Sequence, residues 1–219
     1  MAYFPMFVEL RGKKCLIIGG GKVALRKAVA LLDFEAGLTI VASRIIPEFI
    51  ELEANHRPLV EIIERDYKEE DLQEAFLVIA ATDDKELNRR ISVDCKTKEI
   101  PVNVVDVKEE CSFIFPAYVR KKSITVGITS SGNSPVLTQQ IKKTVEKNLP
   151  DYIGLLSDKM GNARKLVKSE FHTERERKQV YIRMAEIGEK KKGNLTEEDI
   201  YDIMEEMKKE LHQDSSDIK

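Results

Sequence analysis

The stretch Cys15-Leu16-Ile17-Ile18-Gly19-Gly20-Gly21-Lys22-Val23-Ala24 decides the fold. Four apolar residues form a predicted strand, three glycines follow, and a helical pattern begins at once. The stretch fits the G-x-G-x-x-G/A pattern, in which glycines let the backbone approach a pyrophosphate and the helix N-terminus offers free N–H groups. A tight strand-to-helix turn without a ligand is the alternative. Because strand, glycines and helix stand in register, we favour nucleotide binding, with Gly19, Gly20 and Gly21 as contacts.

Further apolar runs extend this beginning into a sheet. Each reads as a strand; with Cys15 to Ile18 they are Leu38 to Val41, Leu59 to Ile63, Leu77 to Ala80 and Val102 to Val105. The stretches between them are long enough for crossover helices, which favours a Rossmann-like α/β fold with a parallel sheet. In the first helix the apolar residues share one face, and we expect Arg26 and Lys27 to be turned away from it.

The second half of the chain has a different pattern of predicted secondary structure. Phe113 to Val119 and Ser123 to Thr129 read as paired strands. Ser134 is the predicted N-cap of a helix that ends before Pro150. This set is too small for its own core, so a partner chain or the first domain must cover it. From Asp151 onward we expect only helices, the last of them capped by Thr196.

We therefore predict three regions: residues 1–113 as the nucleotide-binding domain, 114–150 as a strand and helix region, and 151–219 as a helical domain whose tail is frayed from His212.

Composition narrows the function classes. The chain has 219 residues, 42% hydrophobic and 34% charged, with a net charge of -2, which suits a globular protein and excludes a globally basic nucleic-acid binder. Three widely spaced cysteines suit the reducing cytoplasm. The longest apolar run, Ala75 to Ala81, is far shorter than the ~20 residues that span a bilayer, so we expect no membrane insertion. The three histidines lack ligand spacing, so we expect no metal site.

The end of the second strand leaves the choice of cofactor open. Dinucleotide-binding domains usually carry an acidic residue there for the ribose 2′-hydroxyl, and this chain has Ala42, Ser43 and Arg44 instead. Ser43 can hydrogen-bond the ribose, whereas Arg44 would favour a 2′-phosphate. The residues alone do not decide between NAD and NADP.

Two acidic segments follow later strands at the carboxyl edge, where such folds bind ligands. Thr82-Asp83-Asp84 suits a helix cap that borders the cofactor. Asp106 is either a turn former or a carboxylate near the nicotinamide end of the cleft that accepts a proton during an oxidation.

Two features of the second half suit anions. The loop from Ser130 to Pro135 runs into a helix N-terminus and can cradle an anion, besides the capping by Ser134. The basic stretch from Lys159 to Arg183 is a solvated face or, alternatively, a contact for a polycarboxylate ligand.

In order along the chain, six segments resemble the siroheme synthase N-terminal module, the precorrin-2 dehydrogenase/sirohydrochlorin ferrochelatase family. They are Pro5-Met6-Phe7, Gly19 to Lys27, Ala80 to Asp84, Asn103-Val104-Val105-Asp106, Phe113 to Ala117, and Ser131 to Leu137.

The resemblance implies a homodimeric, NAD-dependent enzyme that oxidises precorrin-2 to sirohydrochlorin, in some members with insertion of ferrous iron. It implies that region 114–150 makes the dimer contact. It assigns the catalytic carboxylate to Asp106, cofactor contacts to Lys22, Val23, Ser43 and Arg44, and a place near the tetrapyrrole to Ser134. The macrocycle's carboxylates then make Arg120 a further contact, and Asn133 lies in the same loop as Ser134.

One departure from the family and two alternative functions remain. After Leu137 the family usually carries an arginine-bearing segment, and this chain reads Thr138-Gln139-Gln140-Ile141-Lys142-Lys143. A chelatase step with ferrous or cobaltous ion leaves no motif, so a dehydrogenase alone fits equally well. A Rossmann module that senses NAD without chemistry is the rival from another class. From the length we expect no methyltransferase module to be fused to the C-terminus.

Overall fold

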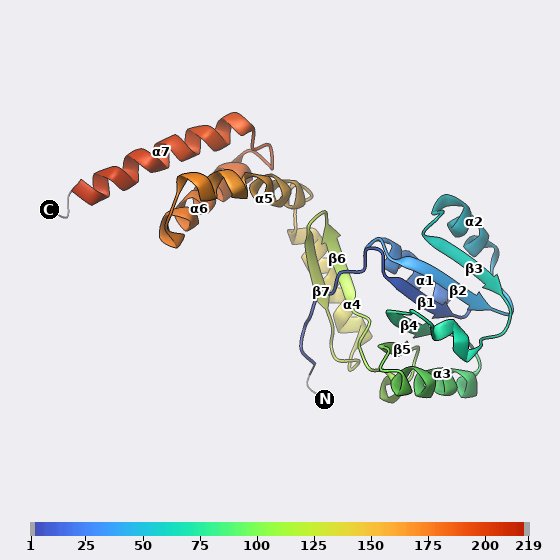
Figure 1. The fold of residues 1–219 in the computed structure, drawn as a ribbon. Helices are drawn as coiled ribbons and strands as arrows, with labels where there is room; N and C mark the ends of the chain where they lie inside the picture. The colour runs from blue at the N-terminus through green and yellow to red at the C-terminus, as the bar shows by residue number, and fades with distance from the viewer. Residues whose placement is uncertain (1–2, 217–219) are drawn as a thin grey trace. The chain divides into compact units, whose positions relative to one another are not determined.

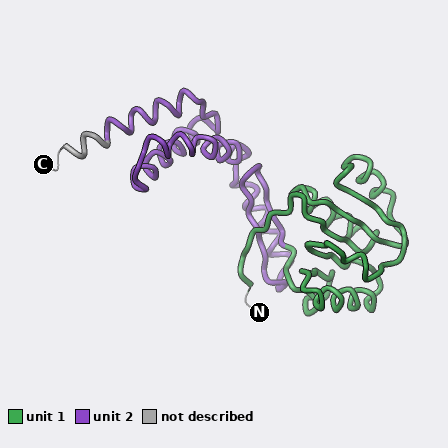
Figure 2. The backbone as a smooth tube through the Cα atoms, viewed as in Figure 1, with its two compact units in different colours: residues 1–115 green, residues 116–219 purple. Residues whose placement is uncertain are grey.

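The computed structural model describes residues 3–216, with side chains up to residue 210. The chain divides into two compact units, residues 1–115 and residues 116–219 (Figure 2). We refer to them as the first and the second unit and describe each by itself.

The first unit is the predicted Rossmann-like domain. Its sheet has five parallel strands in the order β3-β2-β1-β4-β5. The strands are β1 (Lys14–Ile18), β2 (Gly37–Ala42), β3 (Val60–Glu64), β4 (Leu77–Ala80) and β5 (Val102–Val104). The strand order reverses between β1 and β4, and ligands of doubly wound folds bind outside the carboxyl ends of the strands at that point.

Helices cover both faces of this sheet (Figure 1). Helices α1 (Lys22–Leu32) and α2 (Pro47–Asn55) pack on one face, where Ala24, Ala28 and Phe49 join the core. Helix α3 (Lys85–Thr97) and the short 3-10 helix η1 (Glu69–Leu72) cover the other face. Because successive side chains of each buried strand point to opposite faces of the sheet, they form two separate cores.

Two predictions for this unit, one about a crossover helix and one about the end of a strand, need correction. The connection from β3 to β4 contains only η1, although we expected it to be long enough for a crossover α-helix. Val105 lies in a turn rather than in β5, because the chain leaves the sheet there with Asp106 at a φ of 64°.

The second unit begins with an antiparallel hairpin, β6 (Ala117–Lys121) and β7 (Ile124–Ile128). The predicted strand from Phe113 therefore starts four residues too early, because Phe113 is hydrogen-bonded to Asn103 in the first unit. Helix α4 (Pro135–Asn148) contacts both strands and begins as predicted, with the Ser134 side chain accepting a hydrogen bond from the N–H of Leu137.

Three further helices complete this unit: α5 (Tyr152–Glu170), α6 (Glu174–Lys190) and α7 (Glu197–Ser216). Their shared core includes Leu156, Val180, Met184 and Ile203. Thr196 accepts a hydrogen bond from the N–H of Asp199, which confirms the predicted start of α7. The frayed tail was expected from His212, but α7 runs to Ser216, and residues 217–219 lie outside the described part. Within residues 3–216, no helix has both the length and the apolar character needed to cross a bilayer.

Candidate active site

The glycine turn forms the centre of the candidate site at the carboxyl edge of the sheet. A Cβ atom at Gly19, where φ is 127°, would lie 2.2 Å from the carbonyl oxygen of Ala81. A Cβ atom at Gly20 would lie 2.1 Å from the carbonyl oxygen of Arg44. The close approach of three loops therefore requires these two glycines, whether or not a ligand is bound.

Gly21 differs from its two neighbours. It is the N-cap residue of α1, and a Cβ atom built on it meets nothing within 4 Å. No side chain caps this end of α1, and no acidic residue occupies its fully described first turn. The first N–H groups of α1 are thus open to an anion, and the helix dipole adds positive potential there.

The loop after β2 offers the two residues proposed for the ribose end. Ser43 and Arg44 are both exposed, directly after the buried end of β2 at Ala42. The backbone of Arg44 also forms one wall of the glycine turn, so this loop and the turn are in direct contact. The exposed Lys22 and the partly exposed Val23 follow on the first turn of α1.

The loop after β4 has the predicted role of a helix cap. Asp84 is the N-cap of α3 and accepts hydrogen bonds from the N–H groups of Glu86 (2.9 Å) and Leu87 (3.1 Å). Thr82 donates from its hydroxyl to Oδ1 of the buried Asn88 over 2.8 Å. Asp83 is exposed between them.

Asn88 was missing from the predicted site. Its side-chain amide donates to the Thr82 carbonyl oxygen over 2.9 Å, which fixes the loop in a second direction. A polar residue on the buried face of α3, one turn after the cap, is the signal that would have revealed it.

Asp106 combines the two roles that were weighed for it. Its φ of 64° is left-handed, so it is a turn residue, and its side chain is also exposed at the carboxyl end of β5. The chain then folds back along β5. The Cys111 sulfur accepts from the N–H of Val104 (3.2 Å), and Asn103 donates to the Phe113 carbonyl oxygen (3.1 Å).

Lys27 is the second site residue that was not predicted, because we expected it to be turned away from the apolar face of α1. Instead its ammonium nitrogen lies 3.8 Å from the centroid of the Phe115 ring. The pKa of Lys27 is lowered from 10.5 to about 8, chiefly by burial and secondly by the positive charge of Arg26. The charges of Cys111 and Asp106 act in the opposite direction. Among the described side chains, no carboxylate lies within 4 Å of this ammonium group.

The other predicted site residues belong to the second unit. Ser134 caps α4, and its backbone N–H donates to the Ser130 hydroxyl over 2.9 Å. Asn133 is exposed in the same loop, and its N–H donates to the Ser130 carbonyl oxygen. Arg120 is exposed on β6 and donates from Nε to the Lys122 carbonyl oxygen over 3.2 Å. The structure thus gathers the predicted residues of the first unit at one edge, and those of the second unit around α4 and the hairpin.

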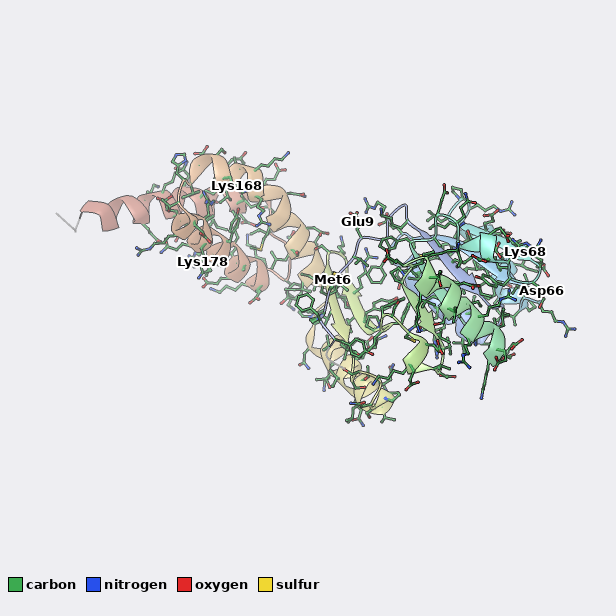
Figure 3. All side chains as sticks on the ribbon, turned by 60° about the horizontal axis from the view of Figure 1, so that its bottom comes forward. Met6, Glu9, Asp66, Lys68, Lys168 and Lys178 are labelled. Carbon is green, nitrogen blue, oxygen red and sulfur yellow. The ribbon has the colours of Figure 1, made fainter. Side chains whose placement is uncertain are left out.

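The basic stretch on α5 and α6 is mostly a solvated face. Lys168 and Lys178 are exposed on these helices (Figure 3). Arg183, by contrast, pairs with Glu206 over 3.1 Å, so part of the positive charge holds helices together.

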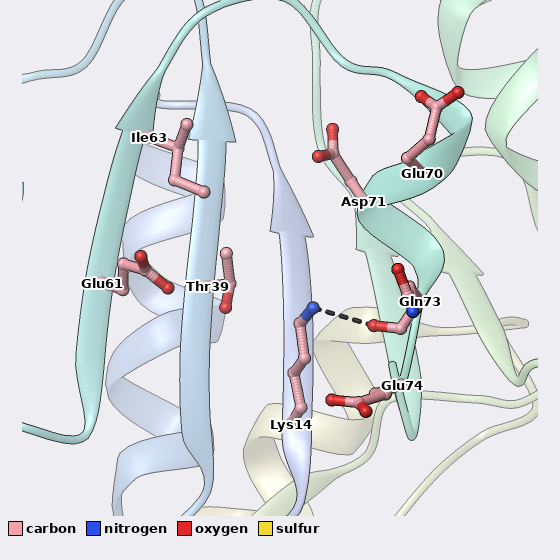
Figure 4. A pocket seen from close by; sticks show the side chains of 8 residues that line it. All are labelled: Lys14, Thr39, Glu61, Ile63, Glu70, Asp71, Gln73 and Glu74. Carbon is pink, nitrogen blue, oxygen red and sulfur yellow. Dashed lines mark hydrogen bonds between the residues drawn. The ribbon is translucent and has the colours of Figure 1, made fainter.

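A hollow of about 330 Å³ in the first unit lies away from this edge. It is lined by Lys14, the first residue of β1, and by carboxylates that include Glu61 and Glu74 (Figure 4). Lys14 donates to the Gln73 carbonyl oxygen over 2.8 Å. Across the described residues, no group of three or more His, Cys, Asp or Glu side chains is placed to hold a metal ion.

Comparisons with known proteins agree with the resemblance. A family described as putative NAD(P)-binding matches residues 6–117. The siroheme synthase of Thioalkalivibrio sulfidiphilus (strain HL-EbGR7) is 37% identical over 186 residues, which are 85% of this chain and 38% of that protein. The siroheme synthase of Ectopseudomonas mendocina (strain ymp) is 43% identical over 171 residues, 78% of this chain and 36% of that protein. The chain therefore spans little more than a third of these relatives.

The solved structure of SirC, precorrin-2 dehydrogenase, superposes with a TM-score of 0.77. The sequences are 21% identical, and the match covers 94% of this chain and 100% of that one. It confirms the fold, with its parallel sheet, small antiparallel sheet and helical region.

Proposed function

The chain belongs to the family of the siroheme synthase N-terminal module, and from this premise we propose that it is an NAD-dependent precorrin-2 dehydrogenase. The observation that carries the proposal is the shared edge of the sheet, where the open N-terminus of α1 and the exposed carboxylate of Asp106 both lie. A dinucleotide and a base are the parts that such an oxidation needs.

The first unit's residues fit a dinucleotide. The open space at Gly21 and the uncapped N–H groups of α1 suit its pyrophosphate, and the Ser43 hydroxyl suits a ribose. Nicotinamide, when bound, accepts a hydride. We take NAD rather than NADP as the cofactor, and the ratio of kcat/KM for the two cofactors tests this choice.

Asp106 receives the proton in the proposed mechanism. Conversion of precorrin-2 to sirohydrochlorin removes one hydride and one proton, and the proton passes to a carboxylate oxygen of Asp106. Exposure to solvent then lets Asp106 release the proton. In the second unit, Ser134 keeps its hydroxyl proton for a substrate group, while Asn133 and Arg120 offer donors to the macrocycle's carboxylates.

The test is anaerobic absorbance spectroscopy with precorrin-2 and NAD. We expect NAD-dependent formation of sirohydrochlorin by the wild type. In Asp106→Asn, kcat should fall about 100-fold or more, while the Kd for NAD stays unchanged. Glu109→Gln, an exposed acid in the following turn, is the matched control and should keep full activity. Full activity in Asp106→Asn would refute its catalytic role, and NAD binding without any oxidation would favour a sensing module.

The same experiment separates two versions of the function. Ferrous or cobaltous ion, added as substrate to the sirohydrochlorin formed, is inserted above the uncatalysed rate only if the chain is also a chelatase. Without that increase, the function is dehydrogenation alone.

The proposed enzyme is a homodimer. None of the residues in the fully described helix α4 is buried, and Val136, Leu137 and Ile141 are 67%, 55% and 51% exposed. A hairpin with one helix does not form a core of its own, so a second copy should cover this apolar face. Light scattering should give twice the chain mass, and Ile141→Glu should lower it towards one. A wild-type monomer at micromolar concentration would contradict the dimer.

The cysteines support a place in the reducing cytoplasm. Cys15, Cys95 and Cys111 are all free thiols, and the first two are buried.

A further inference from the structure

A cavity of about 390 Å³ lies within the second unit, among β7, α5 and α6. The size suits a small-molecule ligand. Its walls are largely apolar and include Ile124, Ile153, Leu156 and Met160. None of the residues predicted for the cofactor lines it, and of the basic stretch on α5 and α6 it includes Arg164.

One glycine on the cavity wall has no explanation in the protein's own packing. Gly154 and Gly188 are required, because a Cβ atom would lie 2.0 Å from the Lys121 carbonyl oxygen and 2.2 Å from Leu156 Cδ1, respectively. A Cβ atom on Gly161 meets nothing within 4 Å. Glycine weakens a helix interior, and Gly161 lies in the middle of α5 on the stripe that lines the cavity. The residue keeps space open rather than making room for a neighbour.

Polar groups on the wall indicate the chemistry of the occupant. Tyr181 lines the cavity, but its hydroxyl is buried behind this surface and has no hydrogen-bond partner among the described residues. Arg164 also lines the cavity, and within the described side chains no carboxylate is near enough to pair with it. Glu189 adds an acceptor from α6. The Arg164 cation beside apolar walls suits an apolar ring that bears a carboxylate.

We propose that this cavity binds an apolar ring carboxylate, with the ring between α5 and α6 and the carboxylate on Arg164. The shared chemistry has two sources, a free ring acid or one carboxylate-bearing edge of the tetrapyrrole. Only the second source rests on the proposed function, so the site itself is testable without it.

The probe is 1-naphthylacetate, whose fluorescence is not overlapped by tryptophan emission because the chain has no tryptophan. We expect saturable binding to the wild-type chain, loss of binding in Gly161→Leu, and about tenfold weaker binding in Arg164→Met. Asn162→Leu and Lys165→Met change the neighbouring exposed positions on α5 and are the matched controls; both should bind as wild type does.

Gly161→Leu should keep or raise the Tm, so a loss of binding cannot be ascribed to unfolding. Equal binding in wild type and Gly161→Leu, or no saturable binding to wild type, overturns the proposal. A shift of dimer mass in Gly161→Leu without probe binding would assign the cavity to a second copy of the chain, which also overturns it. Displacement of the probe by sirohydrochlorin supports the tetrapyrrole edge, and probe binding that sirohydrochlorin leaves unchanged supports a free acid.

Discussion

Replacing Lys27 by methionine tests how much the partly buried Lys27 ammonium group destabilises the folded chain. The pKa of Lys27 is lowered from 10.5 to about 8, and at about 1.4 kcal/mol for each pH unit this difference corresponds to about 3 kcal/mol. Part of the side chain still reaches water, so we expect about 2 kcal/mol. Loss of the contact with the Phe115 ring offsets about 1 kcal/mol of that gain. At pH 7, Lys27→Met should therefore be about 1 kcal/mol more stable than wild type.

The difference in the free energy of unfolding between Lys27→Met and wild type should depend on pH, in a direction that follows from the lowered pKa of Lys27. Below pH 8 Lys27 is protonated in both the folded and the unfolded state. Between pH 8 and 10.5 the folded chain has lost a proton that the unfolded chain still binds, so the free energy of unfolding of the wild type rises with pH. Lys27→Met lacks this rise, so its advantage of about 1 kcal/mol at pH 7 should turn into a disadvantage of about 1 kcal/mol by the upper end of that window.

Urea unfolding of both proteins at pH 7, 9 and 10, followed by circular dichroism at one protein concentration, measures the difference. Lys85→Met, which removes an exposed lysine of the first unit, is the matched control. A difference between Lys27→Met and wild type that stays constant from pH 7 to 10 would refute the reasoning, because it would mean that Lys27 is as well solvated in the folded chain as in the unfolded one.

Three further predictions address the site and the thiols. Gly20→Ala should fail to accumulate as folded protein, since its Cβ would lie 2.1 Å from a carbonyl oxygen, whereas Gly21→Ala should keep the wild-type Tm and bind NAD about tenfold more weakly by calorimetry; equal NAD affinity would contradict the cradle. Ser134→Ala should lose about 1 kcal/mol of stability, and Ser134→Asp should restore the cap but not the activity; restored activity would limit Ser134 to capping. With an aromatic disulfide reagent at pH 8, only Cys111 should react in the folded chain, because burial raises the pKa of the other two thiols to about 12; Cys111→Ser should then show no fast thiol.

The features that depend on neighbouring residues in sequence were predictable. The run from Cys15 to Ala24 gives β1, the turn and the start of α1 within one residue of their predicted bounds, because apolar runs and glycines act locally. Ser134 and Thr196 were identified as caps for the same reason. The carboxyl edge follows from parallel strand order, so Asp106 was correctly expected there.

The features that depend on distant segments were not predictable. Lys27 is on the polar side of α1 by helical spacing, and only the return of the chain along β5 brings Phe115 over it. No sequence pattern around Lys27 predicts the contact between its ammonium group and the Phe115 ring. Asn88 is similar, because its role depends on a loop that the periodicity of α3 does not describe.

Glycines separate what the fold requires from what a ligand requires, and they do so in both units. Gly20 and Gly188 lie against the protein's own atoms, so any side chain there would be costly in the free protein. Gly21 and Gly161 face open space, and alanine in their place would meet no atom of the chain. A glycine that lowers the stability of the folded chain and has no steric reason for its presence needs another explanation. At Gly21 an approaching pyrophosphate supplies one. The same argument, applied to α5, makes the cavity of the second unit a binding site rather than a packing defect.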